Sequence, residues 1–157
     1  MENILFVLLH ISTIFVFLMF IYLLRQKQKG QIQIIFLVNI LLLFIWSIGY
    51  ILEVYYTNTH GTPIMTYVYV WNIGLCFIPS TLLLTGIIYT KTKIKFSIKY
   101  ILLFIPALIS YIILVTNQYH KLFFIHFSME NDQIKYGAYF PIHSFFSYGY
   151  LIIGLFI

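Results

Sequence analysis

The stretch of sequence that decides the fold is residues 32–56, which read IQIIFLVNILLLFIWSIGYILEVYY. Glu53 is the only charged residue in this run. A helix needs about 20 mostly apolar residues to cross about 30 Å of hydrocarbon. Comparable runs cover residues 4–24, 64–89, 98–115 and 141–157. The pattern therefore predicts an all-α integral membrane helical bundle with five transmembrane helices, forming one membrane domain.

The composition agrees with this fold and excludes other classes of protein. Hydrophobic residues make up 62% of the chain and charged residues only 8%, whereas a soluble domain has about 25% charged residues. Disordered chains are less hydrophobic than this. The net charge of +5 does not indicate a nucleic-acid partner, because there is no polar surface on which to spread a phosphate-binding patch. The partner that the composition indicates is the lipid bilayer.

The distribution of basic residues predicts the orientation. The turn at residues 25–29 holds three Lys or Arg residues, the turn at 91–99 holds four, and neither contains an acid. Basic residues favour the cytoplasmic side of a membrane, so we expect both turns there and the N-terminus outside, in a multi-pass protein of the cell membrane. A cleaved signal peptide fits less well, because Glu2 replaces the usual basic residue and the apolar run is too long.

The longest polar connection, residues 116–140, lies on the predicted outer side. Its aromatic segments 121–127 and 133–140 flank the turn-like tetrad Met129-Glu130-Asn131-Asp132, which predicts a short outer β-hairpin between the fourth and fifth helices. An interfacial helix or an irregular lid is the alternative.

No catalytic constellation is visible, and we expect neither a cofactor nor a metal. The chain lacks a glycine-rich phosphate loop, a His-x-x-x-His pair and a cysteine cluster, since Cys76 is the only cysteine. His120 and His126 both lie in the outer connection, but no carboxylate or thiol accompanies them at a metal-binding spacing. We therefore expect solvated or interfacial histidines.

Two ionisable residues within the spans, Glu53 and His143, are the best candidates for a signal site. Such groups usually face the bundle interior or a water-filled cavity. Three further candidates enter the same region, namely Trp71, Asn72 and Tyr148. We predict an outward-opening pocket in which Glu53 and His143 pair to recognise a small or lipid-like ligand. In the alternative, Glu53 reaches the surface or pairs with Lys121, and His143 bonds a nearby backbone group.

Two segments carry a family resemblance. Residues 116–122 read TNQYHKL and residues 136–143 read YGAYFPIH. This pattern resembles the N-terminal seven-transmembrane region of bacterial sensor histidine kinases. The motif positions are Asn117, His120, Tyr136, Gly137 and Phe140. Trp46, Glu53, Trp71, Gly74 and Pro79 resemble the same family.

The resemblance implies a sensory module of a two-component system, which passes an outer signal to a cytoplasmic output module. That module is usually a histidine kinase and sometimes a diguanylate cyclase, and such sensors are typically homodimers. The pattern expects seven helices, so this chain resembles a truncated input module without catalytic activity of its own.

Two other functions remain open at this stage. A small transporter or channel component needs a polar path through the bilayer, and the middle of the spans offers only uncharged groups such as Asn72 and Ser80. The second open function is that of a stand-alone membrane protein that modulates a partner kinase.

Overall fold

The computed structural model describes residues 2–27, 30–91, 97–127 and 134–157. The first three helices are long: α1 (Glu2–Arg25), α2 (Gln31–His60) and α3 (Met65–Lys91). Within the described residues, four helical stretches are long and apolar enough to cross a membrane. They are Ile4–Arg25, Gln31–His60, Met65–Lys91 and Ile98–Val115. The prediction of a helical membrane bundle is therefore confirmed.

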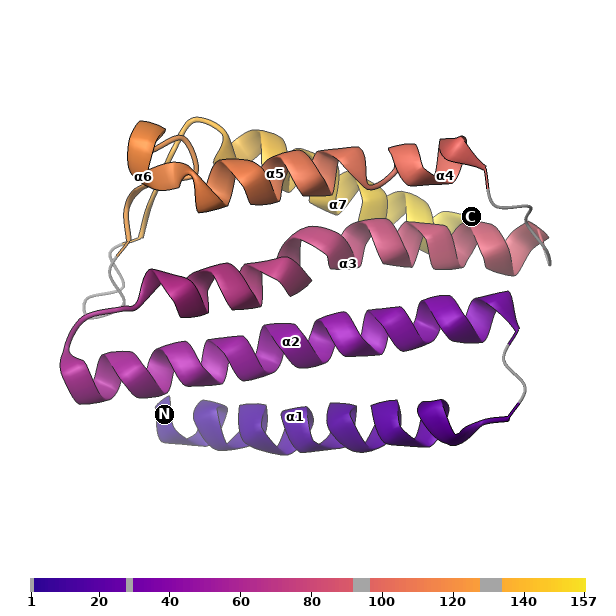
Figure 1. The fold of residues 1–157 in the computed structure, drawn as a ribbon, viewed down its shortest axis with the longest axis horizontal. Coiled ribbons are helices and arrows are strands. Elements are labelled where there is room, and N and C mark those ends of the chain that lie inside the picture. Colours follow the sequence, from indigo (N-terminus) through magenta and orange to yellow (C-terminus); the bar gives the residue numbers. More distant parts are fainter. Residues whose placement is uncertain (1, 28–29, 92–96, 128–133) are drawn as a thin grey trace.

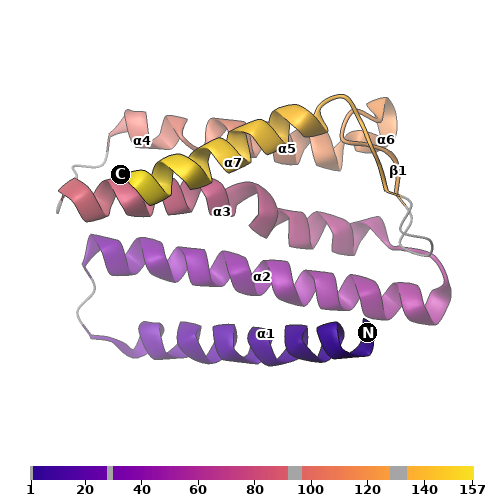
Figure 2. The ribbon, with the colours of Figure 1, turned by 180° about the vertical axis from the view of Figure 1, so that it is seen from behind.

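Helix α3 lies at the centre of the bundle. Figure 1 shows α1, α2 and α3 side by side with alternating direction, and the remaining helices on the other side of α3. Figure 2 shows α7 (Phe140–Phe156) in front, running obliquely from the level of α5 (Ile105–Val115) down to α3, with α4 (Ile98–Leu102) behind its C-terminal half. Large apolar side chains cover the outside, as at Phe15 with 67% of its surface exposed. Such a surface suits contact with lipid.

The fourth predicted span is interrupted rather than continuous. α4 ends at Leu102, and α5 begins at Ile105 with Pro106 in its first turn. Proline lacks a backbone N–H and excludes the carbonyl of the preceding turn, so it favours a helix start. Pro79, in contrast, lies inside α3, whose ribbon bends near its middle (Figure 1).

The second helix extends beyond the predicted run at residues 32–56. Helix α2 continues to His60, and Gly61 then takes a left-handed conformation with φ 71°. Its N–H donates to the carbonyl of Thr57 at 2.8 Å. Glycine adopts this conformation without the steric penalty of a side chain, so the helix ends at the glycine and not at the preceding polar residues.

The fifth apolar segment forms a shorter helix. α7 has 17 residues, about 25 Å at 1.5 Å per residue, and it is too short to count among the four candidate spans. A fifth membrane crossing therefore stays a prediction.

Two short strands lie between α5 and α7. β1 (Phe124–His126) pairs antiparallel with β2 (Lys135–Tyr136), with Phe124 opposite Tyr136. A single helical turn, α6 (Asn117–His120), precedes β1. The predicted tetrad 129–132 lies outside the described residues. The antiparallel pair lies within the two segments predicted to form the hairpin, and the outer hairpin itself stays a prediction.

Glycines allow the long helices to approach closely. A Cβ on Gly74 would lie 2.6 Å from the Leu42 carbonyl oxygen, and one on Gly86 would lie 2.6 Å from the Gly154 carbonyl oxygen. Small residues at helix interfaces are typical of membrane bundles, where close packing replaces the hydrophobic driving force. These contacts hold α2 and α7 against opposite sides of α3.

Candidate functional site

The carboxyl group of Glu53 is enclosed by protein. The side chain is 0% exposed, and Thr57, one turn further along α2, donates a hydrogen bond to its Oε1 at 3.4 Å. Within the described residues Oε2 has no hydrogen-bond partner, and no cationic side chain pairs with the carboxyl. Lys121 is exposed. The alternative in which Glu53 reaches the surface or pairs with Lys121 was therefore wrong.

Trp71 and Asn72 also contain buried polar atoms without partners. The Nδ2 of Asn72 donates to the Val68 carbonyl at 2.8 Å, but its Oδ1 accepts no hydrogen bond from any described residue. The indole Nε1 of Trp71 is likewise buried and unpartnered there. Gly49 brings α2 against Trp71, since a Cβ at Gly49 would lie 2.9 Å from the Trp71 backbone nitrogen. Glu53 follows Gly49 by one turn.

His143 and Tyr148 lie elsewhere, along a groove between α2, α3 and α7. The groove encloses about 290 Å³. Its α7 side is formed by His143, Ser144, Ser147 and Tyr148, together with Phe140 and Leu151. Leu43 and Trp46 of α2 and Leu75, Ile78 and Pro79 of α3 complete the lining. The lining is mostly apolar, with its polar groups concentrated on α7.

The imidazole of His143 forms one inner edge of this groove. The side chain is 5% exposed, and its ring centroid lies 5.3 Å from that of Phe123 and 6.2 Å from that of Phe140. No hydrogen bond reaches the ring from the described part of the chain. The alternative, in which the His143 ring bonds a backbone group, is therefore not observed among the described residues. Aromatic rings pack against the imidazole instead.

A second cavity of about 350 Å³ lies between α1, α2 and α3. Trp71 lines it together with Leu9, Ser47 and Tyr50, and Trp46 and Leu75 line both cavities. Neither Glu53 nor Asn72 contributes to the lining of the two. The predicted site residues are thus divided between a groove on α7, a cavity on α1 and the packed α2–α3 interface.

The predicted pairing of Glu53 with His143 is not observed. Among the described residues, no hydrogen bond or ion pair joins the two side chains, and Glu53 bonds Thr57 of its own helix. Ser144 and Trp46 also line the groove, although sequence reasoning did not include them among the site residues. The signal for Ser144 was present, because polar residues recur at positions 143, 144, 147 and 148 on one side of α7.

The motif residues build the junction between α5 and α7. Oδ1 of Asn117, which is 7% exposed, accepts hydrogen bonds from the backbone N–H groups of Phe123 at 2.8 Å and Phe124 at 3.1 Å. Its Nδ2 donates to the Phe124 carbonyl at 2.8 Å. One side chain thus satisfies three backbone groups, one at Phe123 and two at Phe124, where β1 begins.

His120 has a comparable local role. Its Nδ1 accepts a hydrogen bond from the Leu122 N–H at 3.1 Å, so Nε2 carries the proton and donates to the Thr116 hydroxyl at 3.0 Å. His126 lies in β1. No group of three His, Cys, Asp or Glu residues that could hold a metal ion occurs among the described residues.

The remaining motif residues lead the chain from β2 into α7. The Gly137 N–H donates to the Phe123 carbonyl at 2.8 Å, and a Cβ on Gly137 would collide with the Leu122 carbonyl oxygen. The ring of Tyr136 stacks on that of Phe140 with centroids 3.8 Å apart. Since Phe140 begins α7 and contacts His143, this junction determines where the groove lies.

Comparison with protein families agrees with the motif and the fold. The family model for the N-terminal 7TM region of histidine kinase matches residues 8–157. The chain belongs to this family. A search of curated proteins and a search of solved structures each returned no match. As a histidine kinase 7TM region, the chain is a multi-pass membrane protein whose family works with a kinase output module.

Proposed function

We propose that this 7TM region is the signal-input module of a two-component sensor at the cell membrane. In the proposed arrangement five helices cross the bilayer, the N-terminus and the β1–β2 strand pair lie outside, and a small or lipid-like molecule is the signal. The output module on the cytoplasmic side is a histidine kinase, with a diguanylate cyclase as the alternative. The family match over residues 8–157 is the observation that carries this proposal.

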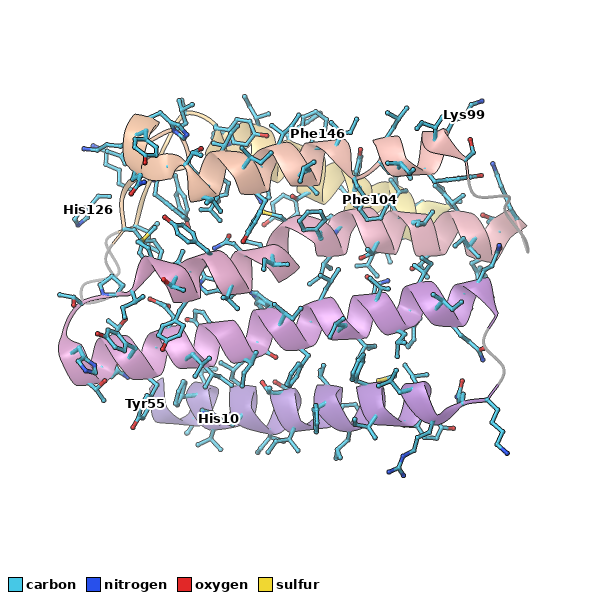
Figure 3. The ribbon with its side chains drawn as sticks, viewed as in Figure 1. His10, Tyr55, Lys99, Phe104, His126 and Phe146 are labelled. Carbon is cyan, nitrogen blue, oxygen red and sulfur yellow. The ribbon has the colours of Figure 1, made fainter. Side chains whose placement is uncertain are left out.

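The position of the basic residues supports the orientation. The last residues of α1 and α3 lie at the same end of the bundle as the first residues of α2 and α4 (Figures 1 and 2). Figure 3 places Lys99 at that end and His126 at the opposite one. Because basic residues favour the cytoplasmic side, the end that holds Lys99 is the proposed inner face. α7 runs toward this end, which is the direction in which a signal would travel.

The packed interface at Glu53 supports a conformational mechanism. A buried carboxyl with one unpartnered oxygen is costly, so an arrangement of α2 and α3 that supplied a partner would compete with the present one. Trp71 and Asn72 of α3 carry two further buried polar atoms that have no partner among the described residues. A signal that favours either arrangement shifts the population between them. Glu53, Trp71 and Asn72 are therefore the proposed switch residues.

The sensory proposal is tested with Glu53→Gln in the chain joined to its output module. The amide keeps the shape of the side chain but removes its ionisation, so autophosphorylation of the kinase should change in amplitude or in its response to signal. Tyr55→Phe is the matched control, because Tyr55 is 65% exposed on the same helix. Output that is identical in the Glu53→Gln variant and the wild type would contradict the role of Glu53.

The transporter alternative gains no support from the polar groups inside the bundle. Asn39 donates to the Thr85 hydroxyl at 3.0 Å and accepts from the Thr81 hydroxyl. Thr85 in turn donates to the Thr81 carbonyl at 2.8 Å. These groups satisfy one another across α2 and α3, so they act as a structural contact between the helices instead of lining a path for a solute.

A further inference from the structure

The groove between α2, α3 and α7 contains polar groups that the protein leaves without partners. No described residue makes a hydrogen bond to the ring of His143 or to the hydroxyls of Ser144, Ser147 and Tyr148, although all four side chains line the groove. Serine in a helix commonly bonds the carbonyl of the preceding turn, as Thr85 does in α3. The two serines of the groove do not, and their hydroxyls stay available to a bound molecule.

We propose that this groove binds a single-chain amphiphile whose head group presents a carbonyl-type oxygen. The proposal deepens the sensory function and rests on it for its physiological meaning. The imidazole N–H and the three hydroxyls supply donors, and a carbonyl or carboxyl oxygen supplies the acceptor that they lack. Ser144 and Ser147 are half-buried and His143 is 5% exposed, so an acceptor bound in the groove would form its hydrogen bonds partly shielded from water, where they are stronger.

The charge of the lining excludes a phosphate head group. None of the residues that line the groove is Lys, Arg, Asp or Glu. Phosphate sites in proteins are built from cationic side chains or from arrays of backbone N–H groups, and this groove has no cationic residue. A neutral head group, or a carboxylic acid in its protonated form, carries no charge and therefore binds without a cationic side chain.

The shape and depth of the groove fit one apolar chain. From His143 to Leu151 along α7 is about 12 Å at 1.5 Å per residue. Leu43 and Ile78 line the groove opposite this part of α7. The volume of about 290 Å³ lies at the small end of ligand cavities, which start at about 300 Å³. Such a volume suits part of a fatty acid or a quinone rather than a two-chain lipid.

Photocrosslinking tests the proposal on the 157-residue chain in lipid nanodiscs. The probe is a palmitic acid that carries a diazirine on its chain, and labelled peptides are identified by mass spectrometry. We expect saturable labelling of peptides from α7 and from the facing parts of α2 and α3. Labelling that rises linearly with probe and is as strong on the lipid-exposed face of α1 would overturn the proposal.

Competition distinguishes the two sources of a carbonyl head. Unlabelled palmitate and a decyl-substituted benzoquinone are added separately, with hexadecane as the competitor that lacks a head group. Displacement by palmitate, by the quinone or by both supports the site and identifies the source. Displacement by hexadecane as effective as by the other two would contradict the role of the polar groups.

Variants test the named residues. Loss of one hydrogen bond to the head group should weaken probe binding about five- to tenfold in His143→Ala or Ser144→Ala. Ser147→Leu should abolish labelling by filling the groove. Gly149→Ala is the matched control on α7, because a Cβ there meets no atom within 4 Å. Unchanged binding in both His143→Ala and Ser144→Ala would overturn the proposal.

His143→Ala removes a buried imidazole and could unfold the chain, so thermal unfolding of each variant is measured. If His143→Ala is unfolded, Ser144→Ala still tests the proposal. The binding measurement requires no kinase. A negative result therefore contradicts the ligand site alone, whereas failure of the sensory function would appear as kinase output that does not respond to changes in this chain.

Discussion

The side-chain amide oxygen of Asn117 accepts a hydrogen bond from the backbone N–H of Phe123 at 2.8 Å, across the turn that follows α5. Phe123 is 0% exposed and lies against both Phe140 and His143. A residue that the family pattern marks is thus linked through one buried ring to the start of α7 and to the edge of the ligand groove. The motif residue acts by positioning the groove.

Asn117→Ala should therefore destabilise the bundle strongly. The substitution removes three hydrogen bonds and leaves two backbone N–H groups buried without partners, at a cost of about 2–4 kcal/mol. Unfolding in a denaturing detergent titration measures this loss. Gln118→Ala, at the exposed neighbouring position, should stay within about 0.5 kcal/mol of the wild type. Equal stability of the two variants would show that Asn117 has no such role.

Gly86→Ala should separate α3 from α7. The added methyl group would lie 2.6 Å from the Gly154 carbonyl oxygen, and overpacking of this kind costs about 1–3 kcal/mol. Spin labels at the exposed positions Tyr89 and Phe156 should report a longer distance by pulsed electron paramagnetic resonance. Gly149→Ala, which meets open space, should leave the distance unchanged. A distance that does not move in Gly86→Ala contradicts this packing.

The contact between Asn39 and Thr81 should show energetic coupling. Their side chains bond across α2 and α3, and such bonds in membrane bundles contribute about 0.6 kcal/mol on average and up to about 1.7 kcal/mol. A double-mutant cycle of Asn39→Ala and Thr81→Ala measures this coupling. The pair Asn39 and Ser47 is the control, because Ser47 bonds the Phe44 carbonyl of its own helix, and its effects should add. A coupling of zero for the first pair would refute the contact.

The proposed orientation predicts which positions a membrane-impermeant thiol reagent reaches in intact cells. Cysteines introduced at Lys27 and Lys99 should stay unlabelled, whereas a cysteine at Tyr119, which is 80% exposed, should react. The native Cys76 is buried, so it provides a low background. Permeabilised cells supply the positive control for the two inner positions. Labelling of Lys27→Cys from outside would reverse the orientation.

Helix positions could be predicted closely because they depend on local composition. The predicted span 64–89 corresponds to α3 at Met65–Lys91, since a charged residue ends an apolar run in any context. The predicted helix ends were wrong where a single glycine or proline decided where a helix ends or begins. Gly61 allowed α2 to continue through polar residues to His60, and Pro106 divided the fourth span into α4 and α5.

The sequence by itself determined that this chain is a helical membrane bundle, and it predicted most of the basic residues at one end, because length, hydropathy and charge are properties of each segment alone. Only the tertiary structure decided that Glu53 lies in the α2–α3 interface while His143 lines a separate groove on α7. In spans that are apolar on every side, periodicity does not reveal which face of a helix meets which neighbour. Close contacts such as Gly49 against Trp71 and Gly86 against Gly154 set that rotation.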